Sequence, residues 1–254
     1  MGNDSTVLLE QSDSIAVLTL TRPYSLNIAG KHELLNTLHQ LAKQENLRAL
    51  IVASGHLEAF LVDVAELANM SPTEARAFSE AGQQVATTLS ELPFPTLAAV
   101  DGQALGGGCE LVMSCDLAYA SARSHLGQIE VLGGIIPGFG GTWRLSHRVG
   151  LQRACEMIFS AAVIDAARAK ELGLVLDVIP EEKLLSHCRE VADKIAKNGK
   201  LAVAQAKKVL LAGAGLPLSA ALVIEQAAFA SLFGTNDQRG RMSAYVKQHD
   251  AQKQ

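Results

Sequence analysis

The sequence predicts an α/β fold with a parallel sheet, followed by a C-terminal segment built of helices. Short apolar runs alternate with amphipathic stretches through the first half of the chain, which is typical of strand–helix–strand units. Beyond Gly141 the pattern becomes almost entirely helical. With 48% hydrophobic and 19% charged residues among 254, the composition is that of a folded globular chain.

The first half of the chain begins with two β-rich runs separated by a polar Gln-Ser-Asp-Ser turn, which predicts a hairpin. Later runs are apolar throughout, as in strands buried on both faces. Ser71 and Pro72 supply an N-cap and a first-turn proline for a long helix. The predicted strands are 6–10, 15–21, 49–53, 96–100 and 116–120, and the predicted helices are 31–42, 71–90 and a short one ending at Ser114.

The second half of the chain contains one strand-like run, Leu-Val-Leu-Asp-Val-Ile at 174–179, among helices. We therefore expect an α/β core over residues 1–195 and a helical segment over 196–254, which forms a small subdomain or an arm that packs on a neighbour. The predicted helices are 142–149, 151–160, 166–172, 181–197, 201–212, 218–233 and 237–248.

Charge and cysteine content exclude several classes of protein. The net charge is −4 and no cluster of Lys or Arg stands out, so a nucleic-acid partner is not expected. No apolar stretch approaches the length of a membrane span and no secretory signal is present, so we expect a cytoplasmic protein without a membrane partner. The four cysteines and the histidines lack metal-ligand spacing, so no metal is expected and the cysteines are predicted to be reduced.

The candidate chemistry is concentrated around a glycine triplet, Gly106 to Gly108, at a predicted strand-to-helix junction. Such a junction exposes backbone N–H groups and a positive helix end, which suit a carbonyl that gains negative charge. Glu110 follows in the first helical turn, and Glu130 lies twenty residues later in a second glycine-rich segment. Two carboxylates beside such donors could exchange protons with water and with a carbon next to the carbonyl. Taken alone, each glutamate has a simpler role, as a helix-dipole partner or a solvated loop carboxylate.

The runs ALGGGCEL and GQIEVLGGIIPGFGGTWRL, with TLTRPYSLN, AARAKELGL and FASLFGTNDQRGRMSAYV, resemble the enoyl-CoA hydratase/isomerase (crotonase) superfamily. The likeness covers nearly the whole chain. It implies a crotonase-like core, a superhelix of ββα units, with the C-terminal helices building a homotrimer or a dimer of trimers. It also implies an acyl-CoA substrate and no separate cofactor, since CoA arrives as part of the substrate.

The resemblance also implies roles for individual residues. Glu110 would activate water, Glu130 would exchange a proton at the α-carbon, and the Gly107 N–H would bind the thioester oxygen. A second oxyanion N–H would come from Val62, although the segment Ala59 to Val64 is two residues shorter than its family counterpart and lacks its glycine. The expected substrate-binding residues are Tyr24, Ser25, Leu26, Leu61, Asp63, Gly106, Pro137, Gly138 and, from an adjacent subunit, Phe229.

The two glutamates decide which reaction the resemblance favours. Addition of water needs a proton acceptor and a proton donor, whereas a double-bond shift can use one carboxylate that matches Glu130. We therefore expect an enoyl-CoA hydratase of the lyase class. The alternatives are a Δ3-Δ2-enoyl-CoA isomerase, a methylglutaconyl-CoA-type hydratase or a decarboxylase. A non-catalytic acyl-CoA binder is also an alternative, because of the shortened loop.

Overall fold

The computed structural model describes residues 5–251. Residues 1–4 of the predicted core and residues 252–254 of the predicted helical segment lie outside the described residues. Its main sheet has six strands in the order β1-β2-β3-β4-β6-β9. β1 pairs antiparallel with β2, and every later pairing is parallel. The α/β prediction with a parallel sheet is confirmed. The strands are β1 Val7–Ser12, β2 Ile15–Leu20, β3 Ala49–Ser54, β4 Thr96–Val100, β6 Leu117–Ser121 and β9 Asp177–Ile179.

The predicted hairpin is present at the start of the chain. β1 and β2 pair from Val7 opposite Leu20 to Ser12 opposite Ile15, so the turn has only two residues between paired ends. Asp13 adopts the left-handed conformation there, with φ of 51°, which a short polar residue tolerates. The strand predicted at 174–179 is shorter than expected, because only Asp177–Ile179 pairs with β6.

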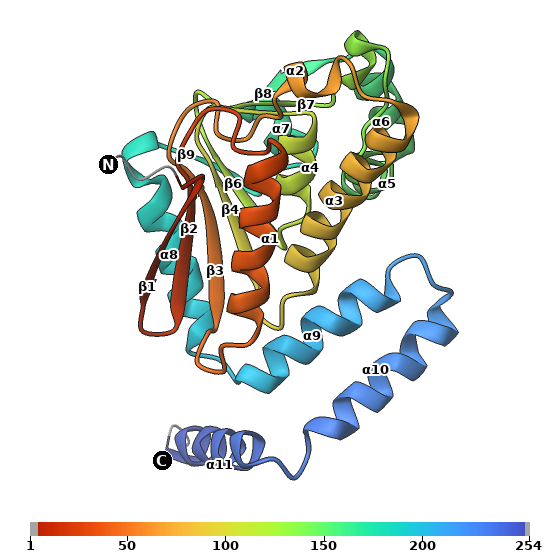
Figure 1. The fold of residues 1–254 in the computed structure, drawn as a ribbon. Helices are drawn as coiled ribbons and strands as arrows, with labels where there is room; N and C mark the ends of the chain where they lie inside the picture. The colour runs from red at the N-terminus through yellow and green to blue at the C-terminus, as the bar shows by residue number, and fades with distance from the viewer. Residues whose placement is uncertain (1–4, 252–254) are drawn as a thin grey trace.

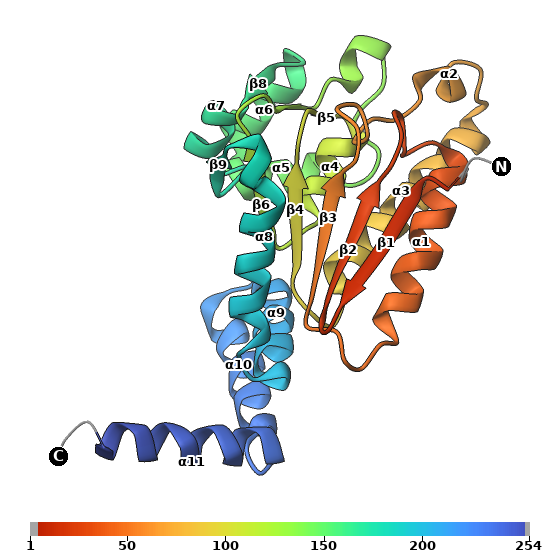
Figure 2. The ribbon, with the colours of Figure 1, turned by 90° about the vertical axis from the view of Figure 1, so that its left-hand side faces the viewer.

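Helices cover both faces of the main sheet (Figures 1 and 2). α8 packs on one face, where Leu184, Cys188 and Ala192 meet side chains from β2, β3 and β4. α1 and α3 lie on the other face, over the larger core. Asn27 caps α1, since its side chain accepts from the Gly30 N–H, and α3 begins with a capping box. The helices before the C-terminal segment are α1 Ile28–Ala42, α2 Val64–Leu67, α3 Pro72–Glu91, α4 Gly107–Met113, α5 Gly141–Val149, α6 Leu151–Phe159, α7 Ala166–Glu171 and α8 Glu181–Ala196.

A second, smaller sheet lies beside the main one and was not predicted. It consists of β5 (Gln103–Leu105), β7 (His125–Gly127) and β8 (Val163–Asp165), with β7 in the middle. β5 leads directly into α4, and β7 is followed by the 3-10 helix η1 (Glu130–Gly133). The parallel pairing of β5 with β7 therefore brings the two glycine-rich segments of the sequence side by side.

Three helices, α9 (Lys200–Gly213), α10 (Leu218–Leu232) and α11 (Asn236–Ala251), extend away from the sheet (Figures 1 and 2). α9 is tied to the core by an ion pair of 2.8 Å between Lys207 and Asp116 and by a 2.9 Å hydrogen bond from Lys207 Nζ to the Phe94 carbonyl. In the described part of the chain no single helix is long and apolar enough to cross a membrane. Leu218–Leu232 and Asn236–Gln248 reach that length and hydropathy only as a pair bent by 83°.

Candidate active site

The glycine triplet lies where β5 turns into α4, and all seven residues of that helix are buried. Gly106 has φ of 55°, a conformation that side chains disfavour, and Gly108 lies so close to Phe60 that an added Cβ would overlap its carbonyl oxygen. Gly107 is the first residue of the helix, so its N–H has no intrahelical acceptor. The predicted donor therefore points out of the start of a fully buried helix.

Glu110 lies one turn into α4 and is only 1% exposed. Its Oε1 accepts hydrogen bonds from the Phe139 N–H at 2.7 Å and from the Gly141 N–H at 2.5 Å. Burial raises the pKa of Glu110 to about 7, although these backbone donors and the charge of Arg144 act in the opposite direction. The side chain is thus held firmly and can still exchange a proton near neutral pH.

Glu130 begins η1 and reaches the same place from the other glycine-rich segment. A Cβ built on Gly106 would lie 3.2 Å from Glu130 Oε1, so the carboxylate lies against the first glycine of the triplet. Both of its oxygens are buried and have no hydrogen-bond partner among the described residues. Burial, and then the negative charge of Glu110, raise the pKa of Glu130 to about 7. The structure therefore brings together the two glutamates that the sequence singled out.

Phe139 is a site residue that the sequence analysis did not identify. Its backbone binds Glu110, and its ring lies in a slot between two glycines. A Cβ on Gly107 would lie 2.6 Å from the ring, and a Cβ on Gly82 of α3 would overlap it. The Gly-Phe-Gly-Gly run at 138–141 was visible in the sequence, but nothing local linked it to Gly82. The ring therefore packs directly against Gly107 at the start of α4.

Gln128 was also missed, although it lies within the quoted glycine-rich run. Its Nε2 donates to the Gly106 carbonyl at 3.0 Å, and its buried Oε1 has no hydrogen-bond partner within residues 5–251. A Cβ on Gly141 would overlap that Oε1 and lie 2.7 Å from Glu110 Oε1. Gln128 therefore fixes the backbone of the triplet and packs tightly behind the catalytic candidates.

The shortened loop between β3 and α2 also reaches the start of α4. Val62 Cγ2 would lie 2.7 Å from a Cβ on Gly107, so Val62 lies next to the triplet, and its role as an oxyanion donor stays a prediction. The loop is braced by backbone hydrogen bonds from the Tyr24 N–H to the Glu58 carbonyl at 3.0 Å and from the Leu26 N–H to the Leu61 carbonyl at 3.2 Å. Two segments expected to line the substrate path thus run side by side.

The other residues predicted to bind substrate have mixed surroundings. The Asp63 side chain caps α2 by accepting from the Ala65 N–H, and the buried Ser25 hydroxyl donates to the Arg22 carbonyl. Pro137 is buried, and the Gly138 carbonyl accepts from Ser79 at 2.6 Å. Phe229 lies on α10, is 64% exposed and contacts Phe233, outside the site of its own chain. Its predicted contact with a neighbouring subunit stays a prediction.

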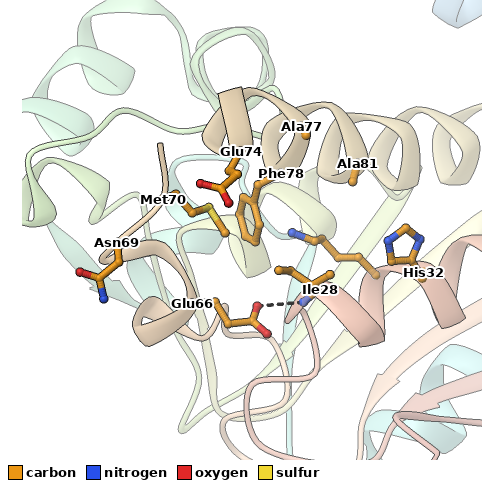
Figure 3. Close-up of a pocket in the computed structure, with 10 residues that line it drawn as sticks. Ile28, His32, Glu66, Asn69, Met70, Glu74, Ala77, Phe78 and Ala81 are labelled. Carbon is orange, nitrogen blue, oxygen red and sulfur yellow. Dashed lines mark hydrogen bonds between the residues drawn. The ribbon is translucent and has the colours of Figure 1, made fainter. Parts of the chain in front are cut away.

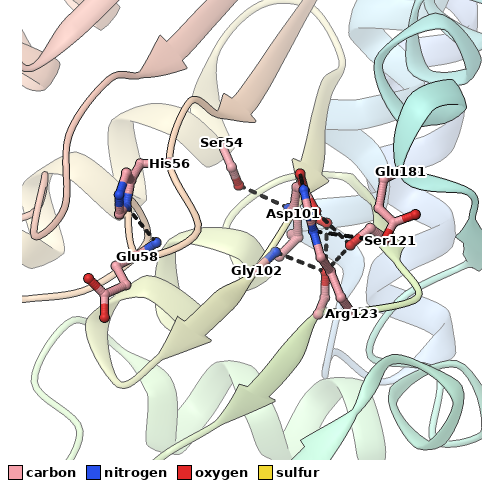
Figure 4. Close-up of polar contacts among 10 residues, drawn as sticks. Ser54, His56, Glu58, Asp101, Gly102, Ser121, Arg123 and Glu181 are labelled. Carbon is pink, nitrogen blue, oxygen red and sulfur yellow. Dashed lines mark hydrogen bonds and ion pairs between the residues drawn. The ribbon is translucent and has the colours of Figure 1, made fainter.

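A polar network holds the turn that leads from β4 to β5 (Figure 4). Asp101 binds Arg123 through two hydrogen bonds of 2.7 and 2.6 Å and also accepts from the Ser121 hydroxyl at 2.8 Å. Ser124 donates to the Val100 carbonyl and lies 3.3 Å from the Gly102 N–H, which donates to it. Because β5 continues directly into the glycine triplet, this network holds in place the strand that leads into the candidate site.

Comparisons with known proteins agree with this arrangement. The family model described as Enoyl-CoA hydratase/isomerase matches residues 10–253, and the chain belongs to this family. It is 38% identical to the short-chain-enoyl-CoA hydratase of Clostridium acetobutylicum, covering 96% of this chain and 95% of that one, and 36% identical to the crotonyl-CoA hydratase of Syntrophomonas wolfei, covering 96% of each. The crystal structure of enoyl-CoA hydratase from Bacillus anthracis superposes with a TM-score of 0.91 at 32% identity, over 96% of this chain and 97% of that one. The crotonase-like fold and the family resemblance are therefore confirmed.

Proposed function

We propose that the protein is an enoyl-CoA hydratase that adds water reversibly to a 2-enoyl-CoA thioester. The observation that carries the proposal is the pair of glutamates beside the start of α4, buried Glu110 and half-buried Glu130, whose pKa values are both raised to about 7. A hydratase needs one group that accepts a proton from water and another that delivers a proton to carbon. Family membership and the names of the two relatives above support the same reaction.

The different surroundings of the two carboxylates suggest which one takes each role. Glu110 accepts two backbone N–H groups, which favours its ionised form and makes it the base for water. Neither oxygen of Glu130 accepts a hydrogen bond from another residue in the described part of the chain, so this carboxyl is better suited to carry a proton. In this assignment the water oxygen bonds to the β-carbon while its proton passes to Glu110. The electron pair of the double bond moves onto the thioester as an enolate, and Glu130 then protonates the α-carbon.

The enolate oxygen would be stabilised by N–H groups at the start of α4. The Gly107 N–H is free of intrahelical acceptors, and the Val62 backbone stands next to it. Donors of this kind typically contribute about 10²–10³-fold each to turnover. The buried surroundings strengthen these interactions, because water does not compete for the same donors.

A homotrimer, or a dimer of trimers, is part of the proposal. α10 exposes large apolar side chains that a monomer would leave in water, among them Leu218, Val223 and Phe229. Clusters of exposed apolar side chains are typical of association surfaces. Sedimentation or light scattering of the purified protein would measure the assembly directly.

The function is tested by loss of the conjugated-thioester absorbance when crotonyl-CoA and longer 2-enoyl-CoAs are mixed with purified protein. Glu110→Gln should lower hydration by about 10²–10⁴-fold, the usual contribution of a general base or acid, and so should Glu130→Gln. An isomerase that depends on Glu130 alone would survive Glu110→Gln when assayed with a 3-enoyl-CoA. Binding of acyl-CoA without any hydration would instead support the non-catalytic alternative.

A further inference from the structure

A buried lysine with no hydrogen-bond partner in the described part of the chain lies at a cavity next to the candidate active site. Lys31 of α1 is only 2% exposed, and its Nζ has no hydrogen-bond partner among residues 5–251. The nearest groups are aromatic, with Nζ 2.8 Å from the ring centroid of Phe78 and 4.9 Å from that of Phe139. A buried amine that keeps only ring contacts loses the hydrogen bonds it had in water, which is costly.

The cavity has a volume of about 450 Å³ and lies between α1, α2 and the first half of α3 (Figure 3). Much of its lining is apolar, from Ile28, Met70, Ala77, Phe78 and Ala81. Such a lining suits a hydrocarbon chain, and the polar side chains around it are Lys31, His32, Glu66, Asn69 and Glu74. The cavity therefore has the composition of a pocket for a chain that is apolar along its length and polar at its end.

The cavity also lies close to the reacting groups. The Phe78 and Phe139 rings are in contact, with centroids 5.5 Å apart. Phe139 in turn lies against Gly107 and binds Glu110 through its N–H. A short acyl chain held at Gly107 can therefore pass beside the Phe139 ring and place its far end near Lys31.

The carboxylates that face the cavity already have donors. Glu66 accepts from the Ile28 N–H at 2.9 Å, as Figure 3 shows, and Glu74 accepts from the Ser71 N–H and hydroxyl in the capping box. Glu66 still raises the pKa of Lys31, but burial has the larger effect and lowers it to about 7. His32, the remaining titratable group of the lining, is exposed. No described side chain supplies a counter-charge in contact with Nζ.

We propose that this cavity receives the far end of the acyl chain and that Lys31 Nζ binds a carboxylate there, so that the preferred substrate is an enoyl-CoA whose acyl group ends in a carboxylate. The inference rests on the proposed hydratase function and defines its substrate class. A carboxylate offers Nζ both an acceptor and an opposite charge, whereas a methyl-ended chain would leave the amine unsatisfied. Lys31 is in this view a specificity residue and takes no part in proton transfer.

The test compares glutaconyl-CoA with trans-2-pentenoyl-CoA, which has the same chain length without the distal oxygens. The wild type should show a kcat/KM about tenfold to a hundredfold higher for glutaconyl-CoA, the range expected for a charge-assisted hydrogen bond. Lys31→Met should abolish this preference. Lys43→Met, which removes an exposed lysine just past the end of the same helix, is the matched control and should keep it. The proposal would be overturned if the wild type preferred pentenoyl-CoA. It would also be overturned if Lys31→Met and Lys43→Met had the same ratio of kcat/KM for glutaconyl-CoA to kcat/KM for pentenoyl-CoA.

Binding of saturated analogues separates this inference from the proposed function. Glutaryl-CoA and pentanoyl-CoA cannot be hydrated, so calorimetry reads the pocket alone. Glutaryl-CoA should bind at least tenfold more tightly than pentanoyl-CoA, and Lys31→Met and Lys31→Gln should each remove this difference. That result would support the Lys31 site even if neither enoyl-CoA were hydrated. Absence of hydration would refute only the proposed hydratase function. Equal affinities for the two analogues in the wild type would refute the Lys31 site, whatever the enzyme does with enoyl-CoAs.

Discussion

Replacing Glu110 by glutamine should make the fold more stable while removing the proposed activity. Burial raises the pKa of Glu110 from 4.5 to about 7. The folded state thus binds this proton more tightly than the unfolded chain does, so protonated Glu110 stabilises the fold at low pH. This stabilisation is lost as pH rises from about 4.5 through about 7. A shift of this size corresponds to about 3 kcal/mol, since one pKa unit is about 1.4 kcal/mol.

The glutamine amide keeps the shape of the side chain and an oxygen that can accept from the Phe139 and Gly141 N–H groups, but it never ionises. The free energy of unfolding of Glu110→Gln should therefore exceed that of the wild type by about 2–3 kcal/mol at pH 8. At pH 5 the difference should shrink to about 1 kcal/mol or less, because the wild-type carboxyl is then mostly protonated in the folded state.

Urea denaturation at pH 5 and pH 8 measures both values. Glu190→Gln removes a negative charge from an exposed position on α8 and serves as the control for the change in net charge. A Glu110→Gln variant that is less stable than the wild type at pH 8, or stabilised equally at both pH values, would refute the reasoning. Hydration of crotonyl-CoA by the same protein should fall by about 10²–10⁴-fold, so stability and activity move in opposite directions.

Three further predictions follow from close packing and from one buried ion pair. Gly82→Ala should push the Phe139 ring toward the site and lower kcat for crotonyl-CoA about tenfold or more, which steady-state kinetics would show. Gly108→Ala meets a backbone carbonyl that cannot move aside and should cost about 3 kcal/mol in urea denaturation, whereas Gly133→Ala, with open space around it, should change stability by less than about 0.5 kcal/mol. Lys207→Met removes the cation that pairs with the partly buried Asp116, which then keeps only its hydrogen bonds from Thr96, and should cost about 2–3 kcal/mol by the same measurement.

The main elements could be predicted from the sequence because their patterns are local. The buried strands are continuous apolar runs, and the adjacent Ser71 and Pro72 mark the start of α3. The small sheet could not be predicted, because β5, β7 and β8 have three residues each and form no periodic pattern. Their pairing depends on the rest of the fold.

In the candidate site, too, the residues found in local motifs could be predicted, whereas their long-range contacts could not. Glu110 and Glu130 were identified from motifs, and their proximity came from the family resemblance. The contacts that give them their properties are long-range, since Phe139 lies 29 residues beyond Glu110 and Gly82 belongs to another helix. Lys31 was read only as the start of a helix, because a lysine in an amphipathic stretch is normally solvated.

The buried polar side chains that lack a hydrogen-bond partner in the described part of the chain lie close to the candidate active site. Native proteins give nearly all buried polar groups a hydrogen-bond partner, so the exceptions require a reason. Within residues 5–251, the buried side-chain atoms without a partner belong to Lys31, Gln128 and Glu130. Gln128 and Glu130 contact Gly106, and Lys31 lies 4.9 Å from the Phe139 ring. Lys31 and a protonated Glu130 can each gain a partner when the proposed substrate binds, whereas Gln128 Oε1, an acceptor packed behind the two glutamates, gains none from an enoyl-CoA. Part of the free energy that these unsatisfied groups cost the fold is then recovered when substrate binds.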